Sequence, residues 1–157
     1  MDRGFKPVHW CLDCGSSLAE AEVDYLDKTS RAIDVKFRID ETLEKKFIKQ
    51  NKLPENSKVF AVIWTTTPWT IPGNQAVCVN KDIEYSLVEV TKNEIYIIAS
   101  ELVKTCFDRW SLEDFEIIKK MKGNDLDGLH FIHPLYNRTS PLLFSEHVTT
   151  DTGTGCV

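Results

Sequence analysis

The residues best suited to chemistry in this chain are three consecutive threonines, Thr65, Thr66 and Thr67. They follow an apolar run that ends at Trp64, and they precede a loop restrained by two prolines and a glycine, 68–73. Threonine hydroxyls donate and accept hydrogen bonds, and threonine methyl groups can wall a small apolar pocket. Because binding residues concentrate on loops held by a rigid scaffold, the segment is a candidate binding site. The alternative is a turn whose hydroxyls satisfy neighbouring backbone groups.

A second polar segment, 149–155, places Gly153, Thr154 and Gly155 after a run of hydroxyl-bearing residues. Glycine lets a backbone approach a ligand closely, and the hydroxyls could bind an anion or a ribose. A dinucleotide-binding site is excluded, because the third glycine and the strand–helix–strand setting of that motif are missing.

The cysteines allow two further interpretations. Cys11 and Cys14 have the spacing of half a zinc knuckle, but a structural zinc site needs four ligands and no second pair has this spacing. A zinc-ribbon-like interaction module and a reduced pair in a turn both stay open. Nothing in the spacing pairs a thiol nucleophile at Cys156 with His147 or His133, and inert buried cysteine is the default.

The elements that must position these residues are mostly short strands. Alternating or continuous apolar runs predict strands at 33–39, 59–64, 75–79, 85–90, 95–99 and 115–119. Asp40 and Ser100 are candidate N-caps of two small helices, the second running to Trp110, and 65–74 is expected to be irregular. Turns are expected at 124–128 and 137–141. The predicted fold class is mixed α/β and β-rich, with a closed or partly closed barrel-like core and small helices on its rim.

Size and composition fit one globular domain, 1–157, with an entry segment at 1–30. The chain has 157 residues, 42% hydrophobic and 27% charged, and a net charge of −5. The acidic balance argues against a free-standing nucleic-acid binder, although not against a module of a larger enzyme. No apolar run reaches the roughly 20 residues that span a bilayer, and residues 1–7 lack a signal-peptide core. Five cysteines in such a chain predict a reducing, cytoplasmic location.

Three segments together carry a family resemblance. Residues 64–74, Trp-Thr-Thr-Thr-Pro-Trp-Thr-Ile-Pro-Gly-Asn, resemble the threonine-rich motif of the isoleucyl-tRNA synthetase editing domain, bacterial type. Residues 6–11 and 19–25 resemble the entry to that inserted domain, called connective peptide 1. Residues 147–155 resemble its glycine-containing motif. The matches are in order and span nearly the whole chain.

The resemblance implies an aminoacyl-tRNA hydrolase module. In this family the domain deacylates valine mischarged onto tRNA(Ile), so its partners would be the tRNA 3′ end and the rest of the synthetase, with no membrane. Thr65, Thr66 and Thr67 would line the pocket for the ester and the terminal adenosine. Trp69 and Asn74 would support or border that pocket. Gly153, Thr154 and Gly155 would complete the set of substrate-binding residues.

The resemblance also says what this segment would lack. The family motif continues into a His-Thr-Ala-Pro-Gly-His-Gly stretch, whose histidine and a later aspartate would follow Val157. We therefore expect a domain truncated before its last active-site segment, with catalytic residues unassigned and little or no activity alone. No cofactor is expected within the segment. The parent would ligate isoleucine to tRNA(Ile) with ATP and Mg, and zinc in some relatives. A non-catalytic ligand-holding module is the alternative.

Overall fold

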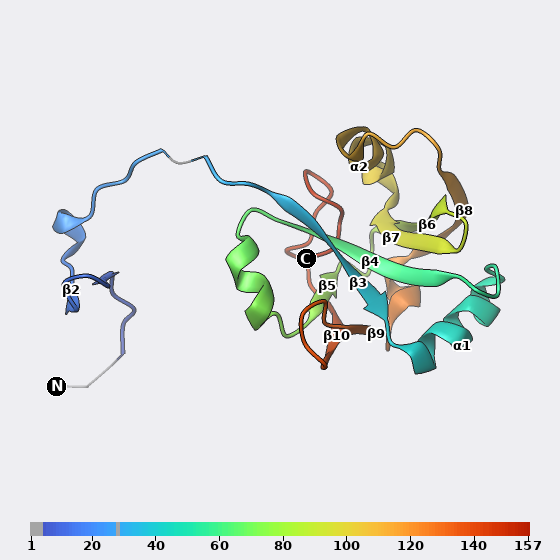
Figure 1. Ribbon diagram of the computed structural model, residues 1–157, viewed down its shortest axis with the longest axis horizontal. Helices are drawn as coiled ribbons and strands as arrows, with labels where there is room; N and C mark the ends of the chain where they lie inside the picture. Colours follow the sequence, from blue (N-terminus) through green and yellow to red (C-terminus); the bar gives the residue numbers. More distant parts are fainter. Residues whose placement is uncertain (1–4, 28) are drawn as a thin grey trace. The chain divides into compact units, whose positions relative to one another are not determined.

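Figure 1 shows the computed structural model of the chain, which describes residues 5–27 and 29–157. By its internal contacts the chain divides into two compact units, Met1–Ser30 and Arg31–Val157. The expectations for residues 1–4, including the lack of a signal-peptide core, lie outside the described residues. No helix in the described part is long and apolar enough to cross a membrane.

The first unit is built around a short hairpin. Strand β1 (Trp10–Cys11) pairs antiparallel with β2 (Ser16–Ser17), and a 3₁₀ turn, η1 (Glu20–Glu22), follows. Gly15 has φ of +62°, and its N–H donates to the carbonyl of Cys11 at 2.9 Å. Glycine adopts this left-handed conformation at little cost. The chain therefore turns tightly at Gly15, just after the Cys-x-x-Cys pair.

The second unit is built on one mixed sheet of eight strands, in the order β5-β10-β9-β3-β4-β7-β6-β8. The strands are β3 (Ile33–Ile39), β4 (Lys58–Thr65), β5 (Val77–Val79), β6 (Glu84–Thr91), β7 (Glu94–Ala99), β8 (Glu116–Lys122), β9 (His130–Ile132) and β10 (Thr139–Phe144). The β4–β7 and β5–β10 pairs are parallel, and the other pairs are antiparallel.

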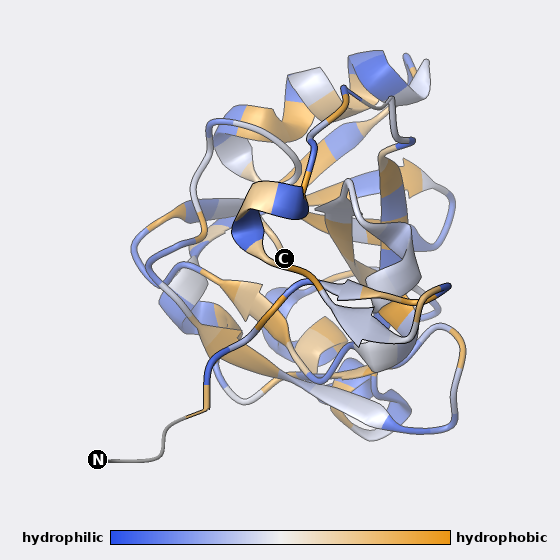
Figure 2. Ribbon diagram, turned by 90° about the vertical axis from the view of Figure 1, so that its left-hand side faces the viewer, coloured by the Kyte–Doolittle hydropathy of each residue, from blue (hydrophilic) through white to orange (hydrophobic). Residues whose placement is uncertain are grey.

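Short helices complete the unit. They are α1 (Glu41–Asn51), η2 (Pro68–Gly73), η3 (Ser100–Leu102), α2 (Val103–Trp110) and η4 (Gly123–Leu126). The predicted cap of α1 is confirmed, because the Asp40 carboxylate accepts the N–H of Thr42 at 3.0 Å. That bond and the Thr42 hydroxyl lower the pKa of Asp40. Figure 2 shows apolar stretches along the strands and alternating polar and apolar stretches along the helices.

A buried carboxylate fixes α1 to the sheet. Glu44 on α1 is 5% exposed and pairs with Arg38 of β3 at 2.6 Å. The other Glu44 oxygen accepts the N–H of Val59 on β4 at 2.9 Å. A buried charge is tolerated when it is paired and hydrogen-bonded in this way. The core beneath is apolar, with Phe37, Leu87 and other strand residues fully buried.

The mixed, strand-rich fold class is confirmed, but the sheet is not a closed barrel. Within residues 31–157 no ladder joins the two ends of the sheet, β5 and β8. The free side of β5 is taken by the end of the chain instead, because Cys78 and Val157 exchange backbone hydrogen bonds of 2.6 and 3.0 Å. The N–H of Ala99 at the end of β7 donates to the carbonyl of Thr154 at 2.9 Å. Residues 154–157 thus bridge β5 and β7.

Several local predictions are wrong in detail. The segment after Thr67 is not irregular but forms η2, since Pro68 fits the first position of a helix, where its missing N–H would have no helical partner. The predicted helix from Ser100 splits into η3 and α2, and the Ser100 hydroxyl bonds Ser86 at 2.8 Å rather than capping. Strand β10 begins inside the turn expected at 137–141, and β8 extends beyond Lys119 to Lys122.

Candidate functional site

A cavity of about 260 Å³ lies between the two threonine-containing motifs. One side is formed by Trp64, Thr65 and Thr66, which we call the threonine wall. The other side is formed by residues 152–157, which we call the glycine wall. His147 and Thr149 complete the lining. Segments more than 80 residues apart in the sequence therefore meet at one hollow, at the end of β4.

The hydroxyl groups in and beside the threonine wall make local hydrogen bonds. The Oγ1 of Thr65 accepts the N–H of Thr67 at 3.0 Å and lies 3.2 Å from the Thr67 hydroxyl. The Thr70 hydroxyl and N–H donate to the carbonyl of Thr67 at 2.7 and 3.0 Å. The alternative of a turn stabilised by its own hydroxyls thus describes Thr65 and Thr67, while Thr65 and Thr66 also line the cavity. Trp69 is 69% exposed and lies outside the lining.

Asn74 lies beside a neighbouring cavity of about 290 Å³, which shares Trp64, Thr65 and Val157 with the first. Its side-chain amide donates to the carbonyl of Ala76 at 2.8 Å and accepts the Ser140 hydroxyl at 2.8 Å. Because both ends of the amide are engaged, Asn74 braces the end of η2 against β10. The structure thus places Thr67, Trp69 and Asn74 around the threonine wall rather than in the first cavity.

The glycine wall has a backbone that only glycine adopts easily at two positions. Gly153 and Gly155 have φ of +84° and +76°. A Cβ on Gly155 would lie 2.3 Å from the Cβ of Ala99, and a Cβ on Gly153 would lie 3.2 Å from the Trp64 ring. Gly153 therefore packs directly against the threonine wall, and this contact sets the spacing of the two walls.

Carbonyl groups anchor the glycine wall to three parts of the fold. The buried Tyr85 hydroxyl donates to the carbonyl of Gly155 at 2.7 Å, and Ala99 donates to that of Thr154. The Cys106 thiol donates to the carbonyl of Gly153 at 3.2 Å. Thr154 is 1% exposed, and its hydroxyl is 3.2 Å from the carbonyl of Cys156. Thr154 thus offers its backbone, rather than a free hydroxyl, to the cavity.

Several lining residues are not among those predicted to bind substrate. His147 lines the cavity, with its Nδ1 hydrogen-bonded to the Ser145 hydroxyl. Its place two residues before Thr149 was the available signal. Trp64, Thr149 and Thr152 also line the cavity, although only their neighbours were singled out.

A thiol nucleophile is disfavoured by its surroundings. Cys156 lies in the lining but is 1% exposed, and burial raises the pKa of its thiol to about 12. His133 has a structural role, because its Nε2 forms a 2.9 Å hydrogen bond with the carbonyl of Ile71. Buried protonated thiols of this kind are inert.

The Cys11–Cys14 pair lies in the first unit. The N–H of Cys14 points at the Sγ of Cys11 at 3.3 Å, and this hydrogen bond lowers the pKa of the Cys11 thiol. Among residues 5–27 and 29–157, no group of three or more His, Cys, Asp or Glu side chains is arranged to hold a metal ion.

The fold matches a known class of domain. The chain resembles the crystal structure of GlLeuRS-CP1, with a TM-score of 0.68, 22% identity, and coverage of 81% of this chain and 53% of that one. It also resembles the editing domain of the cytosolic leucyl-tRNA synthetase of P. knowlesi, with a TM-score of 0.66, 16% identity, and coverage of 85% and 58%. The chain therefore has the fold of an aminoacyl-tRNA synthetase editing domain.

The sequence comparison narrows this class. The chain is 51% identical, over its full length, to a segment of the isoleucine–tRNA ligase of Colwellia psychrerythraea. The ligase of Francisella tularensis subsp. tularensis is 50% identical over the full length of the chain. The chain spans 17% of the length of each of these relatives. No protein-family model matches. The chain thus corresponds to one segment of the bacterial isoleucine–tRNA ligases.

Proposed function

We propose that this chain is the editing segment of an isoleucine–tRNA ligase and that it serves the hydrolysis of valine mischarged onto tRNA(Ile). The observation that carries the proposal is the cavity of about 260 Å³ between the threonine wall and the glycine wall. The threonine-rich and the glycine-containing motifs that resemble the editing domain both contribute to it. The full-length match to isoleucine–tRNA ligases supports the same assignment.

The chemistry explains why such an enzyme needs a second cavity. Valine and isoleucine differ by one methylene, which an apolar pocket distinguishes by only about 1–3 kcal/mol. A synthetic site selective for isoleucine must therefore admit some valine. A second site that is too small for isoleucine removes the product that passed the first. A small cavity walled by threonine methyl groups suits that task.

The two walls would divide the work. Thr65 and Thr66 would contact the aminoacyl ester through hydroxyl and methyl groups, and the backbone of Gly153, Thr154 and Gly155 would approach the ester and the terminal adenosine. Thr67, Trp69 and Asn74 would hold the shape of the threonine wall. Hydroxyls and loop amides would orient a water that attacks the ester carbonyl. The resemblance puts the histidine and aspartate of the reaction after residue 157.

The proposal includes the partners of a cytoplasmic synthetase. The acceptor end of tRNA(Ile) would enter the cavity, and the remainder of the ligase would supply most phosphate contacts. This division is compatible with the net charge of −5. ATP and Mg would serve the ligation site elsewhere in the parent enzyme.

Deacylation by a segment-exchange enzyme tests the proposal. Residues 1–157 replace the matching segment of the Colwellia psychrerythraea ligase, and release of valine from valyl-tRNA(Ile) is followed beside release of isoleucine from isoleucyl-tRNA(Ile). We expect valine release to be retained and isoleucine release to stay slow. Loss of valine release in a folded enzyme that still charges isoleucine would contradict the proposal.

A paired substitution locates the activity. Thr66→Tyr fills the cavity, whereas Thr105→Tyr places the same side chain on an exposed position of α2. We expect only the first to abolish valine release. The 157-residue chain alone, assayed in parallel, should release little or no valine while still binding a non-hydrolysable valyl-adenosine analogue.

A further inference from the structure

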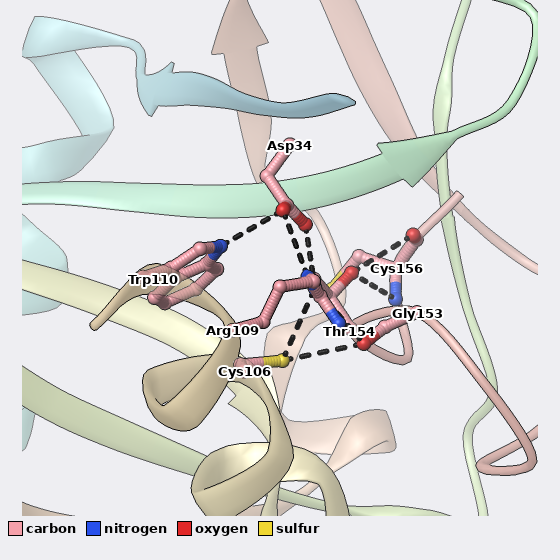
Figure 3. Close-up of polar contacts among 7 residues, drawn as sticks. All are labelled: Asp34, Cys106, Arg109, Trp110, Gly153, Thr154 and Cys156. Carbon is pink, nitrogen blue, oxygen red and sulfur yellow. Dashed lines mark hydrogen bonds and ion pairs between the residues drawn. The ribbon is translucent and has the colours of Figure 1, made fainter. Parts of the chain in front are cut away.

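The end of α2 lies against the glycine wall from outside the cavity. The Cys106 thiol donates to the carbonyl of Gly153 at 3.2 Å, and the Nη2 of Arg109 lies 3.5 Å from the same oxygen. The Arg109 Nη2 is also 3.7 Å from the Cys106 sulfur. Figure 3 shows Arg109 between Asp34 on one side and the carbonyl of Gly153 on the other.

Arg109 is itself held in a fixed geometry. Its Nη2 and Nε donate to the two carboxylate oxygens of Asp34 at 2.7 and 3.1 Å, which is the bidentate arrangement that restricts a guanidinium most. The indole N–H of Trp110 donates to the same carboxylate at 2.8 Å. Asp34 is therefore fixed by two residues of α2. Its hydrogen bonds with Arg109, and then its charge, raise the pKa of Arg109 further above its already high value.

The contacts of Asp34 and Arg109 link residues of both walls. Asp34 on β3 is the cross-strand partner of Trp64 on β4, and partners in an antiparallel pair present their side chains on the same face. The Trp64 ring lies where a Cβ of Gly153 would point. The carbonyl of Gly153 accepts a hydrogen bond from Arg109, and Arg109 forms an ion pair with Asp34. One ion pair thus connects the threonine wall to the glycine wall.

The direction of the Gly153 carbonyl determines the orientation of the Gly153–Thr154 peptide. Glycine restricts its own rotation least, so the peptide between Gly153 and Thr154 could otherwise turn over. In a trans peptide the C=O and the following N–H point in opposite directions. Fixing the carbonyl toward α2 therefore fixes the Thr154 N–H on the opposite side.

We propose that Arg109, oriented by Asp34, is a positioning residue for the editing reaction, which it serves by holding the Gly153–Thr154 peptide in one orientation. The inference rests on the proposed function and names the group that regulates the geometry of that site. Arg109 does not line the cavity and would not touch the substrate. It acts through the peptide alone.

A positioning role and a merely structural role predict different results. The Arg109 side chain is 32% exposed and that of Asp34 18%, so their pairing adds little to stability because water screens it. A misplaced backbone group at a reacting ester, in contrast, costs up to about 100-fold in rate. Loss of Arg109 should therefore lower the rate of editing far more than it lowers the melting temperature.

The test uses Arg109→Ala in the segment-exchange ligase. We expect kcat for valyl-tRNA hydrolysis to fall about 30-fold, KM to stay within about twofold, and the melting temperature to fall by less than about 4 °C. Added guanidinium should restore part of the rate. Lys120→Ala is the matched control, because it breaks a 3.0 Å pair with Glu84 on the exposed face of β8, and we expect no change in kcat.

Asp34→Asn sharpens the test. It keeps the size of the side chain but removes the charge that orients Arg109, so the Asp34→Asn, Arg109→Ala double variant should be no slower than Arg109→Ala alone. Unchanged kcat in Arg109→Ala would overturn the proposal. So would a fall in kcat that guanidinium does not relieve and that follows the melting temperature.

A spectroscopic measurement separates this inference from the proposed function. In the 157-residue chain, the Gly153 carbonyl-carbon and Thr154 amide-nitrogen signals should shift in Arg109→Ala and return with guanidinium. If the exchanged ligase does not hydrolyse valyl-tRNA, the proposed function fails, and these signals still decide whether Arg109 holds the peptide. If the signals stay in place, the positioning role is wrong even where hydrolysis is present.

Discussion

The two walls of the cavity are built in opposite ways. The glycine wall takes its hydrogen bonds from distant parts of the chain, because Tyr85, Ala99 and Cys106 each donate to one of its carbonyls. The threonine hydroxyls of residues 65–70 bond within that segment, while the backbone of Trp64 and Thr65 pairs with β3. Residues 153–156 are buried, whereas Thr66 is exposed. The carbonyls of the glycine wall thus depend on distant donors, whereas the hydroxyls of the threonine segment bond locally.

Substitutions in the two walls should therefore affect different properties of the protein. Buried backbone groups with fixed partners are costly to disturb, so the glycine wall should respond to substitution through unfolding. Exposed threonines whose bonds water can replace should respond mainly through ligand binding. The four predictions below measure that contrast, beginning with the largest expected effect.

Thiol reactivity should differ most between the walls. Burial raises the pKa of Cys156 in the glycine wall to about 12, whereas a cysteine introduced by Thr66→Cys would be exposed, with an ordinary pKa of about 8.5. At pH 8 we expect iodoacetamide to modify the introduced cysteine at least about 1,000-fold faster, measured by peptide mass spectrometry.

The two cysteines should also differ in how their modification rates change with pH. Thiolate increases about tenfold per pH unit below the pKa, so the Cys156 rate should keep rising between pH 9 and 11. The rate at the introduced cysteine should level off above about pH 9. Equal rates at pH 8 would mean that the glycine wall is not closed in solution.

Gly155→Ala should destabilise the chain by about 3 kcal/mol, because φ is +76° and the new Cβ would meet Ala99 at 2.3 Å. Gly128→Ala is the control for backbone strain alone, since φ is +75° with nothing within 4 Å, and should cost about 1 kcal/mol. Gly73→Ala, beside the threonine wall with open space, should stay within about 0.5 kcal/mol. Urea unfolding measures all three, and a cost at Gly155 no larger than at Gly128 would contradict the packing argument.

Tyr85→Phe should cost about 2 kcal/mol in unfolding free energy. The hydroxyl donates to the carbonyl of Gly155 and accepts the N–H of Asn80 at 3.0 Å, so its removal strands two backbone groups. Tyr136→Phe on the surface is the control, with an expected change within about 0.5 kcal/mol. Similar values for the two variants would show that the glycine wall does not need its anchor.

Thr65→Val should have the smallest effect, within about 1 kcal/mol of unfolding free energy, because water can replace the hydrogen bond that the Thr65 Oγ1 accepts from the N–H of Thr67. Valine keeps the branched shape that suits the end of β4. A loss above about 2 kcal/mol, measured by the same urea unfolding, would mean that the threonine wall is also part of the cooperative core.

The sequence predicted what depends on local pattern. Alternating residues from Ile33 to Ile39 specified β3 to the residue, and Asp40 caps α1 as expected. The polar motifs were recognisable because threonine, proline and glycine have local conformational signatures. Their meeting at one cavity follows from strand order, which spacing does not encode.

What the sequence did not predict depends on distant partners. Nothing near Arg109 indicates that Asp34 or Gly153 would lie beside it. The Ser100 hydroxyl was expected to cap a helix, but it forms a hydrogen bond with the Ser86 hydroxyl on β6 instead. The 3₁₀ helix η2 depends on support from outside, such as the contact of His133 with Ile71. These contacts join residues that are distant in the sequence and that have only weak local conformational preferences.

The most direct test of the cavity with two walls is an NMR titration of the 157-residue chain with a non-hydrolysable valyl-adenosine analogue. We predict that the amide signals of Thr65 and Thr66 and those of Gly153–Gly155 shift together along one binding curve. An isoleucyl analogue at the same concentration should move neither set. Shifts confined to one wall, or equal responses to both analogues, would contradict a single size-selective cavity built by the two walls.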